Sequence, residues 1–308
     1  MFAPRLLLLY LPQPLERRLL LPFRAIRAVA RKARGYQATM SVPRFAAALD
    51  ELGITAGKTI LLHSSMDQLV AHVPELKPFT LIQLLKDKLG PQGTLLMPAY
   101  PFRGAQADYA RQAAPFNPAR TPSRSGLLTE MLRRDRTAIR SWHPTHAMVG
   151  WGQHAEALLA DHHKGHPFGP TSPFQKLAQQ QGEVMGLGVG LESYSLLHVP
   201  ETMVPELQRA VYYDQPYPMQ IVVQAEQNIT CMVPLLRMGG AYRRVERVAR
   251  ILRREQILWE QHVHGLRLSR MSAAPFIQRA LTLQQQGRFL FDPAEVEAML
   301  ASAPRPPF

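Results

Sequence analysis

Apolar residues recur along this chain in short uninterrupted runs that alternate with stretches of helical spacing. In Ser41–Leu52 they fall on one side of a helix that begins behind a serine and ends at a glycine. Thr59–His63 is a short apolar run of the strand type, Phe79–Leu89 is again helical, and Gly93–Pro98 is a second buried strand. Strands that alternate with helices predict an α/β fold with three layers.

The same alternation continues through the middle of the chain. Gly126–Arg134 is amphipathic at helical spacing, and Ala155–Ala160 is a shorter helix. Glu183–Val189 is a strand with glycines at alternate positions, and Leu197–Met203 is a helix start or a turn. The α/β pattern is therefore not confined to the first hundred or so residues.

Two stretches lack a period and predict loops. Ala99–Ser125 is proline-rich and irregular, and Asp161–Pro173 is rich in histidine, glycine and proline. Long loops of this kind are usually functional or disordered. Beyond them, Met219–Gln224 is strand-like and residues 241–256 form a basic helix. We expect the C-terminal third to be helical.

The chain divides into three parts. Residues 41–290 carry the α/β pattern and form the predicted domain, residues 1–40 are a basic helical leader, and residues 291–308 are a C-terminal tail. Within the leader, the apolar run Leu6–Leu11 is too short to span a bilayer. The leader also lacks the basic-then-apolar order of a signal peptide.

The leader allows two interpretations. Leu19–Ala30 predicts a basic amphipathic helix, so that residues 1–34 could rest on an anionic membrane surface. Alternatively its leucines pack on the domain or on a second subunit of a homodimer. With neither a spanning segment nor a signal peptide, we expect a cytoplasmic protein, peripheral at the inner membrane face under the first interpretation.

Composition adds a large excess of positive charge. Lysine and arginine number 36 against 23 aspartate and glutamate residues, giving a formal net charge of +13. A positive surface favours anionic partners. The basic runs lack interleaved aromatic residues and a nucleic-acid-binding motif, so no specific nucleic-acid partner is expected. Cys231 is the single cysteine, which excludes an internal disulfide.

Serine hydroxyls follow the first predicted strand directly. Ser64 and Ser65 lie where this strand passes into the start of a helix. Backbone N–H groups and hydroxyls at such a point can hold a pyrophosphate. An ordinary serine N-cap explains the same residues, and both interpretations stay open.

Histidines supply further candidates. His143 and His146 flank a Pro-Thr dipeptide, and could shape a cleft by hydrogen bonding or belong to loop structure. A denser group of histidines consists of His154, His162, His163 and His166. Thiolate and carboxylate ligands at metal-site spacing are missing from both groups, and Lys164 interrupts the denser one, so we expect no metal site.

His198 and Glu201 form the pair with the most specific chemistry. Their i, i+3 spacing puts both side chains on one helical face, and Pro200 between them favours a helix start. A carboxylate that accepts a hydrogen bond from one ring nitrogen leaves the other nitrogen to act as a base. The alternative is a capping acid in the first turn of a helix.

Six segments, taken in their order along the chain, carry a family resemblance. They are ILLHSSMDQL, GPQGTLLMPAY, PFNPARTPSRSGLLTEMLRR, SWHPTHAMVGWGQHAEALL, HPFGPTSPFQKL and EVMGLGVGLESYSLLHVPE. In this order they resemble the aminoglycoside 3-N-acetyltransferase family, also called the antibiotic N-acetyltransferase superfamily. The resemblance does not extend to the basic leader.

The resemblance implies a three-layer α/β/α sandwich with acetyl-CoA as co-substrate and no metal. It implies that His198 is the base that deprotonates the acceptor amine, that Glu201 orients it, and that His143 lies at the active-site cleft. The segment that approaches the coenzyme corresponds to Ser64, Ser65 and Met66. The amine would attack the thioester directly, and Cys231 lacks the setting that activates a nucleophilic thiol.

The chain departs from the family pattern where acidic or polar residues are usual. Asn117 and Thr171 stand in place of acids, Leu191–Ser195 replaces an HDRNT-like stretch, and Ala147 replaces a small hydroxyl residue. We therefore expect the acceptor to be an amino sugar that carries phosphate, nucleotide- or lipid-linked, as in surface-polysaccharide or secondary metabolism. The alternatives are an aminoglycoside, as in antibiotic resistance, and a non-catalytic relative that binds coenzyme A or a glycan.

Overall fold

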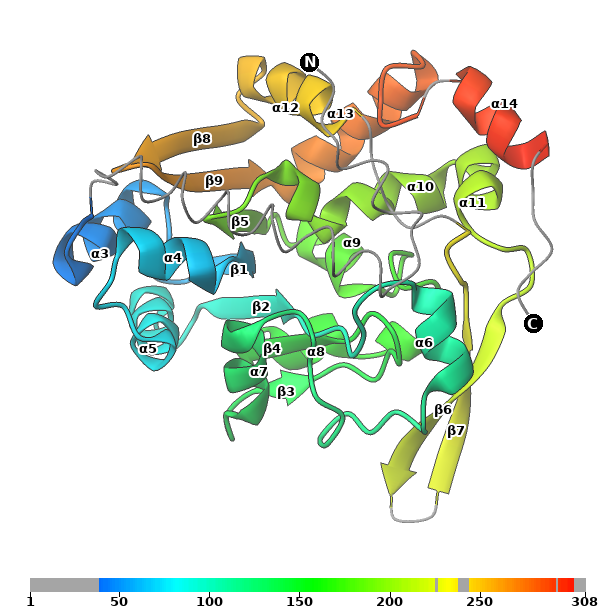
Figure 1. The fold of residues 1–308 in the computed structure, drawn as a ribbon, viewed down its shortest axis with the longest axis horizontal. Coiled ribbons are helices and arrows are strands. Elements are labelled where there is room, and N and C mark those ends of the chain that lie inside the picture. Colours follow the sequence, from blue (N-terminus) through cyan, green and yellow to red (C-terminus); the bar gives the residue numbers. More distant parts are fainter. Residues whose placement is uncertain (1–38, 225–226, 238–243, 292, 302–308) are drawn as a thin grey trace, which may run out of the picture. The chain divides into compact units, whose positions relative to one another are not determined.

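Three parallel strands, buried on both faces, form the centre of the sheet (Figure 1). In this computed structural model, β1 (Thr59–Ser64) lies between β2 (Thr94–Pro98) and β5 (Glu183–Leu187) and pairs with both. Every residue of β2 and β5 is buried, which is why these strands are nearly continuous apolar runs in the sequence. The three predicted strands are confirmed.

Antiparallel strands extend the sheet on both sides into the order β3-β4-β2-β1-β5-β9-β8. On one side lie β4 (Met148–Gly152) and β3 (Ile139–Arg140). On the other lie β9 (Leu266–Ser272) and β8 (Leu258–Val263). The prediction of a helical C-terminal third is therefore incomplete, because β8 and β9 form a hairpin that completes the sheet between helices.

One layer of helices covers the face of the sheet to which Ile60 and Leu62 point, while the intervening Leu61 points to the other face. This first layer consists of α3 (Val42–Glu51), α4 (Met66–His72), α5 (Pro78–Leu89) and α7 (Leu127–Arg134). The helices predicted at Ser41–Leu52, Phe79–Leu89 and Gly126–Arg134 are confirmed.

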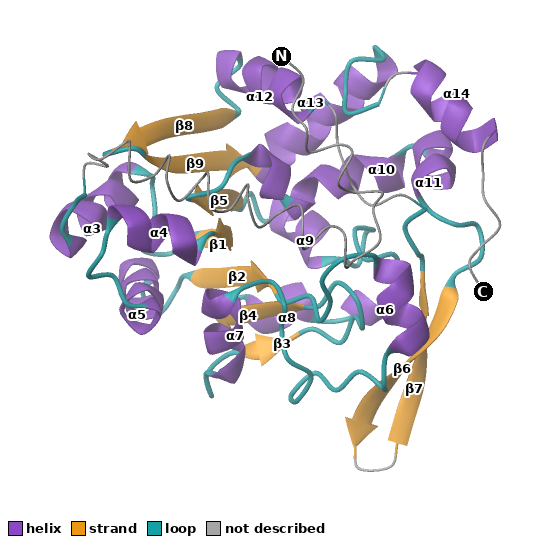
Figure 2. Cartoon of the chain, viewed as in Figure 1, coloured by secondary structure: helices purple, strands orange, loops and turns teal. Residues whose placement is uncertain are grey.

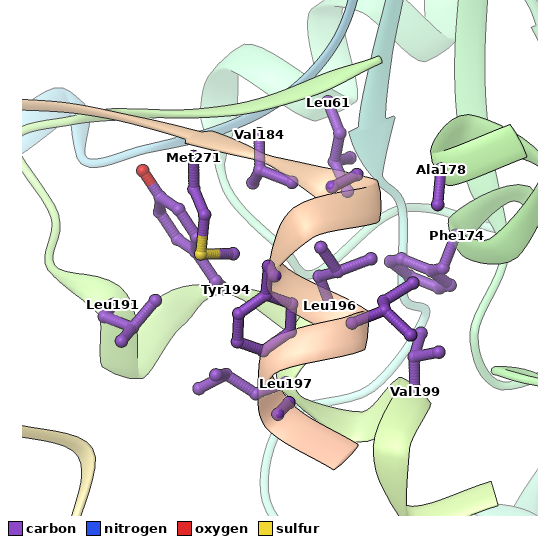
Figure 3. Close-up of a cluster of buried hydrophobic side chains, with 14 of the residues drawn as sticks. Leu61, Phe174, Ala178, Val184, Leu191, Tyr194, Leu196, Leu197, Val199 and Met271 are labelled. Atoms are coloured by element: carbon purple, nitrogen blue, oxygen red, sulfur yellow. The ribbon is translucent and has the colours of Figure 1, made fainter. Parts of the chain in front are cut away.

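A second layer covers the opposite face (Figure 2). It consists of α8 (Ala155–Leu159), α9 (Pro173–Gln179), α12 (Val245–Arg254) and α13 (Ala273–Gln285). Figure 3 shows its core, where Leu61 and Val184 of the sheet face side chains that include Phe174 and Leu196. Helices on both faces of one sheet make the predicted three-layer α/β/α architecture, which is confirmed.

A two-stranded ribbon, β6 (Tyr217–Gln224) and β7 (Gln227–Val233), lies apart from the main sheet (Figure 1). Phe116 of the proline-rich segment pairs with Ile221 of β6, and both side chains are fully buried. The same segment contains the short helix α6 (Gln106–Gln112), so the expectation that Ala99–Ser125 is irregular throughout is wrong. Packing against the ribbon stabilises a helix whose own sequence is too short to signal one.

Several short turns and helices lie outside the two main helical layers. They are the 3₁₀ turns η1 (His162–Lys164), η2 (Leu191–Ser193) and η3 (Ser195–His198), and the helices α10 (Val199–Met203), α11 (Pro205–Val211) and α14 (Pro293–Ala301). Val296 of α14 packs against Leu207 and Ala210 of α11. The helix start or turn predicted at Leu197–Met203 corresponds to η3 and α10.

The structure describes residues 39–224, 227–237, 244–291 and 293–301. Residues 1–38 of the basic leader lie outside these residues, and so do the membrane contact expected for residues 1–34 and residues 292 and 302–308 of the expected C-terminal tail. The domain limits at residues 40, 41, 290 and 291 stay predictions. Among the residues described, every helix is too short or too polar to cross a bilayer.

Candidate active site

A pocket of about 300 Å³ opens at the carboxyl ends of the three parallel strands. Ligands of open α/β sheets bind at this edge, where the strands end and the following loops diverge. Its lining comes from the last residues of β1 and β2, from residues that follow β1, β2 and β5, and from the start of α7. The lining residues are Leu62, His63, Ser64, Met66, Pro98, Tyr100, Phe102, Ser125, Gly126, Leu127, Leu128, Thr129, Val189, Ser193 and Ser195.

Two of the three residues expected near the coenzyme line this pocket. They are Ser64 and Met66. Ser65 is the N-cap of α4, where its Oγ accepts a hydrogen bond from the N–H of Gln68 at 3.4 Å. The capping interpretation therefore describes Ser65, while Ser64 and Met66 stand where a ligand could reach them. The coenzyme-binding role of all three stays a prediction.

His198 and Glu201 contact each other, as their spacing predicts. His198 ends η3 and is the N-cap of α10, and Glu201 lies in the first turn of α10. The His198 Nδ1 and the Glu201 Oε2 are 2.9 Å apart. The Glu201 side chain is fully buried, whereas 19% of the His198 side chain is exposed. The carboxylate is thus held inside the protein, while part of the imidazole is exposed to solvent.

Two aromatic residues that the sequence did not single out hold this pair. The Tyr212 hydroxyl donates to the same Glu201 Oε2 at 3.3 Å. Burial raises the pKa of Tyr212 well above its usual value, so the hydroxyl keeps its proton. Phe168 stacks on the His198 ring with centroids 4.7 Å apart. The His198 imidazole is therefore held by the Phe168 ring against one face and by the Glu201 carboxylate at Nδ1.

His143, which the family resemblance places at the active-site cleft, forms hydrogen bonds within its own loop. It is completely buried, and its Nδ1 accepts hydrogen bonds from the N–H groups of Thr145 at 3.3 Å and His146 at 3.1 Å. Burial lowers the pKa of His143 well below its usual value, which keeps the ring neutral and able to accept. This geometry favours the loop-structure interpretation over direct contact with a substrate. A catalytic role for His143 stays a prediction.

A chain of side-chain contacts joins the pocket to the His198–Glu201 pair. Tyr100 lines the pocket, and its ring meets the edge of His146 at 4.9 Å. His146 in turn meets Phe168 at 5.0 Å, and Phe168 stacks on His198. The Tyr100 hydroxyl also donates to the Oγ of Ser195 at 2.8 Å, and Ser195 begins the turn that His198 ends. The pair therefore lies one turn from the pocket wall.

The other histidines are engaged in loop structure. His162 is buried between the Ser141 hydroxyl, 2.9 Å from its Nδ1, and the Pro167 carbonyl, 3.0 Å from its Nε2. Burial lowers the pKa of His162 to about 3 and that of His166 to about 4. Over the described part of the chain, no three histidine, cysteine or acidic side chains gather in a way that could hold a metal ion.

Two of the departures from the family pattern, Asn117 and Thr171, differ in their surroundings. The Asn117 Oδ1 accepts hydrogen bonds from the N–H groups of Ala119 at 3.0 Å and Arg120 at 2.9 Å. This closes a tight turn that an aspartate could also close. The Thr171 Oγ1 is buried without a hydrogen-bond partner in the described structure. Neither residue supplies negative charge to the site.

Comparison with known proteins connects this site to a family. The model of a family described as aminoglycoside 3-N-acetyltransferase matches residues 61–285, which is more than half of the chain. The aminoglycoside N(3)-acetyltransferase VII of Streptomyces paromomycinus is 35% identical over 189 residues, which cover 56% of this chain and 64% of that protein. The matched region therefore spans less than two thirds of this curated relative.

Solved structures show the same fold over more of the chain. A histidine-to-alanine mutant of aminoglycoside acetyltransferase AAC(3)-IVa, in complex with a gentamicin, has a TM-score of 0.68 and 26% identity over 87% of this chain and 99% of that one. The binary complex of AAC-IIIb with CoASH has a TM-score of 0.66 and 22% identity over 82% and 98% of the two chains, a likeness of fold alone. By its family match, this chain belongs to the aminoglycoside 3-N-acetyltransferase family.

Proposed function

We propose that this chain transfers the acetyl group of acetyl-CoA to an amino group of an aminoglycoside-like acceptor. The observation that carries the proposal is the His198–Glu201 hydrogen bond of 2.9 Å, one turn from a pocket at the carboxyl edge of the sheet. The pair occurs in a member of a family whose curated relatives are named for acetyl transfer to aminoglycosides.

The first step of the proposed reaction is removal of a proton from the acceptor. An ammonium group has no lone pair with which to attack a thioester, so a base must take its proton. Glu201 accepts the hydrogen bond from Nδ1–H of His198, and this tautomer places the basic lone pair on Nε2. General-base catalysis of this kind contributes about 10²–10⁴-fold to the rate.

Acyl transfer then follows without a covalent enzyme intermediate. The amine nitrogen forms a bond to the thioester carbonyl carbon and loses its second proton to solvent, and the carbon–sulfur bond breaks as the amide forms. The proton held by His198 can pass to the departing thiolate, so that free coenzyme A and the N-acetyl product leave a neutral imidazole behind. The buried Glu201 carboxylate stabilises the imidazolium in the interval.

The acyl donor is assigned to the pocket at the carboxyl edge of the sheet. Ser64 and Met66 line it, as expected of the coenzyme segment, and the pocket adjoins η3 through Ser195. Coenzyme A supplies the thioester; the chain supplies the base and its orientation. His143, which holds the loop that carries His146, acts as a positioning residue in this scheme.

The comparisons favour an aminoglycoside acceptor over the phosphate-bearing amino sugar expected from the sequence, because the curated relatives are named for the former. One observation keeps the amino sugar as a second candidate. The chain carries a net charge of +13 and has Asn117 and Thr171 where acids are usual in the family. A net positive charge repels a polycation at long range.

A coenzyme A release assay over a panel of amines tests the proposal. With acetyl-CoA, gentamicin-type compounds should give turnover, and His198→Ala should lower kcat by about 10²–10⁴-fold. His262→Ala, on the remote strand β8, serves as the matched control and should retain the parental rate. Turnover confined to nucleotide-linked amino sugars would select the second candidate. Silence of the parent protein with every amine tested would contradict acetyl transfer.

A further inference from the structure

Ser195 carries a hydroxyl group in the same turn as the proposed base His198, and it lines the pocket. Ser195 and His198 are the first and last residues of η3. Residues i and i+3 of a 3₁₀ helix eclipse one another, so both side chains leave the turn on the same side. Ser195 also lines the pocket assigned to the acyl donor. It is therefore the residue through which the turn carrying His198 meets that pocket.

Tyr100 sets the direction of the Ser195 hydroxyl. The Tyr100 O–H donates to the Ser195 Oγ at 2.8 Å. A serine hydroxyl has one proton to donate and two lone pairs to accept with. Because Tyr100 occupies a lone pair, the serine proton remains available to another acceptor, and donation from tyrosine strengthens it as a donor.

Tyr100 is itself held firmly. It follows β2, and its N–H donates to the Ser125 Oγ at 2.8 Å while its carbonyl accepts from the N–H of Arg124 at 2.7 Å. Burial raises the pKa of Tyr100, so the phenol stays protonated across the neutral range. The tyrosine–serine pair is thus a fixed donor arrangement and not a surface contact formed by chance.

Acyl transfer needs such a donor. When an amine attacks a thioester, the carbonyl oxygen gains negative charge, and a hydrogen-bond donor placed in advance stabilises that charge. In the proposed mechanism His198 acts on the amine, and neither His198 nor Glu201 donates a hydrogen bond to this oxygen.

We propose that Ser195 is a catalytic residue whose hydroxyl, supported by Tyr100 as a positioning residue, donates a hydrogen bond to the thioester carbonyl oxygen of the acyl donor. The inference rests on the proposed function. During attack, the carbon–nitrogen bond forms, the electron pair of the carbonyl moves onto oxygen, and Ser195 donates to it. The pair returns as the carbon–sulfur bond breaks, with no net transfer of the serine proton.

Kinetics of substitutions test this role. Ser195→Ala should lower kcat by about 10²–10³-fold, as loss of one oxyanion donor does elsewhere, with little change in KM for the acceptor. Tyr100→Phe should have a smaller effect, roughly tenfold, and the double variant should be about as slow as Ser195→Ala alone, because the two residues act as one unit. Ser195→Thr, which keeps the hydroxyl, should recover most of the rate.

The chain offers a matched control in a second tyrosine–serine pair. Tyr194 and Ser269 have hydroxyl oxygens 2.8 Å apart, and Ser269 lies on β9 away from the pocket lining. Ser269→Ala therefore removes a hydrogen bond of the same kind and length. Its kcat should stay within about twofold of the parent, since it touches no reacting atom. Loss of kcat in both serine variants alike would overturn a catalytic role for Ser195.

A spectroscopic measurement separates this inference from the proposed function. Acetyl-CoA labelled with carbon-13 at the thioester carbonyl should show a lowered carbonyl stretching frequency when bound to the parent, and Ser195→Ala should restore the frequency seen in an aprotic solvent. A parent that turns over amines without this shift would overturn the inference alone. A parent that fails to bind acetyl-CoA would overturn the proposed function, and the inference with it.

Discussion

The Glu201 carboxylate has no contact with solvent, and this makes it the residue on which the proposed base depends most. A buried carboxylate is costly unless hydrogen bonds compensate for the lost water. Its Oε2 accepts from both the His198 ring and the Tyr212 hydroxyl. Because a carboxylate can only accept, the proton of the neutral imidazole must sit on Nδ1. The hydrogen bond to the Glu201 carboxylate thus leaves Nε2 as the basic nitrogen of His198.

Glu201→Gln should expose this dependence. A glutamine amide can donate to Nδ1 and so favour the opposite tautomer, with the proton on the nitrogen that should act as base. We expect kcat to fall by up to about 10⁴-fold, the loss found when the orienting aspartate of a serine-protease triad becomes asparagine. Measured at saturating acetyl-CoA, Glu206→Gln on the exposed face of α11 is the control and should retain the parental kcat. Equal rates in parent and Glu201→Gln would show that the pair is structural only.

At the scale of elements, the hairpin β8–β9 closes one side of the sheet through a two-residue turn. Val263 and Leu266 pair across it, and His264 and Gly265 between them have φ angles of 49° and 85°. Two positive φ angles define the turn that fits the twist of a β-hairpin, and asparagine followed by glycine suits it best. His264 adopts this backbone without such a preference.

Two substitutions in this turn should act in opposite directions. Gly265→Ala places a β-carbon in a left-handed conformation and should lower the free energy of unfolding by about 1–2 kcal/mol. His264→Asn should raise it by a few tenths to about 1 kcal/mol, since asparagine tolerates that conformation. Urea titrations of the two variants beside the parent provide the measurement. A shift of the same sign in both would mean that the turn does not govern the hairpin.

This hairpin also shows where sequence patterns fell short. The central strands were predictable because burial on both faces leaves continuous apolar runs such as Thr59–His63. In β8 and β9 apolar residues alternate with polar and charged ones, which is a weaker signal than a continuous apolar run. Because a basic helix precedes them, the pattern is interpreted as further helix from the sequence alone. The cue that could have revealed the hairpin is His264-Gly265 between two alternating runs.

The candidate site likewise contains contacts that the sequence predicted and contacts that it could not predict. Local spacing brought His198 and Glu201 together, because residues i and i+3 are neighbours on any helical turn. Tyr212 and Phe168 could not be predicted as their partners, because the contacts join different elements through tertiary packing. His143 begins the HPTH segment. The sequence of this segment predicts a turn, but it does not predict whether the His143 ring faces a cleft or the interior.

At the scale of the whole molecule, the protein holds several histidines neutral in its interior. Burial lowers the pKa of His63 and His162 to about 3 and that of His166 to about 4, against about 6.5 in the unfolded chain. Burial also lowers the pKa values of His143 and His146. Between pH 6.5 and pH 4 the unfolded chain therefore binds protons at positions where the folded protein does not.

This difference in proton binding should make the fold sensitive to acid. The neutral histidines contribute stability that is fully present above pH 6.5 and is lost as the pH falls towards 4, because protons then favour the unfolded state. For His63, His162 and His166 together, the free energy of unfolding should fall by about 4 kcal/mol per pH unit within that window. Urea titrations at pH 7, 6 and 5 measure this slope.

A single substitution checks that the slope comes from these rings. His162→Gln should lower the slope of the free energy of unfolding against pH by the share of one titrating group. This should hold whatever the effect on stability at pH 7, because the slope depends on the number of protons bound and not on contacts. A free energy of unfolding that stayed constant from pH 7 to pH 5 would mean that the buried rings are protonated in the folded protein. The Nδ1 of His143 could then not accept the two backbone N–H groups that close its loop.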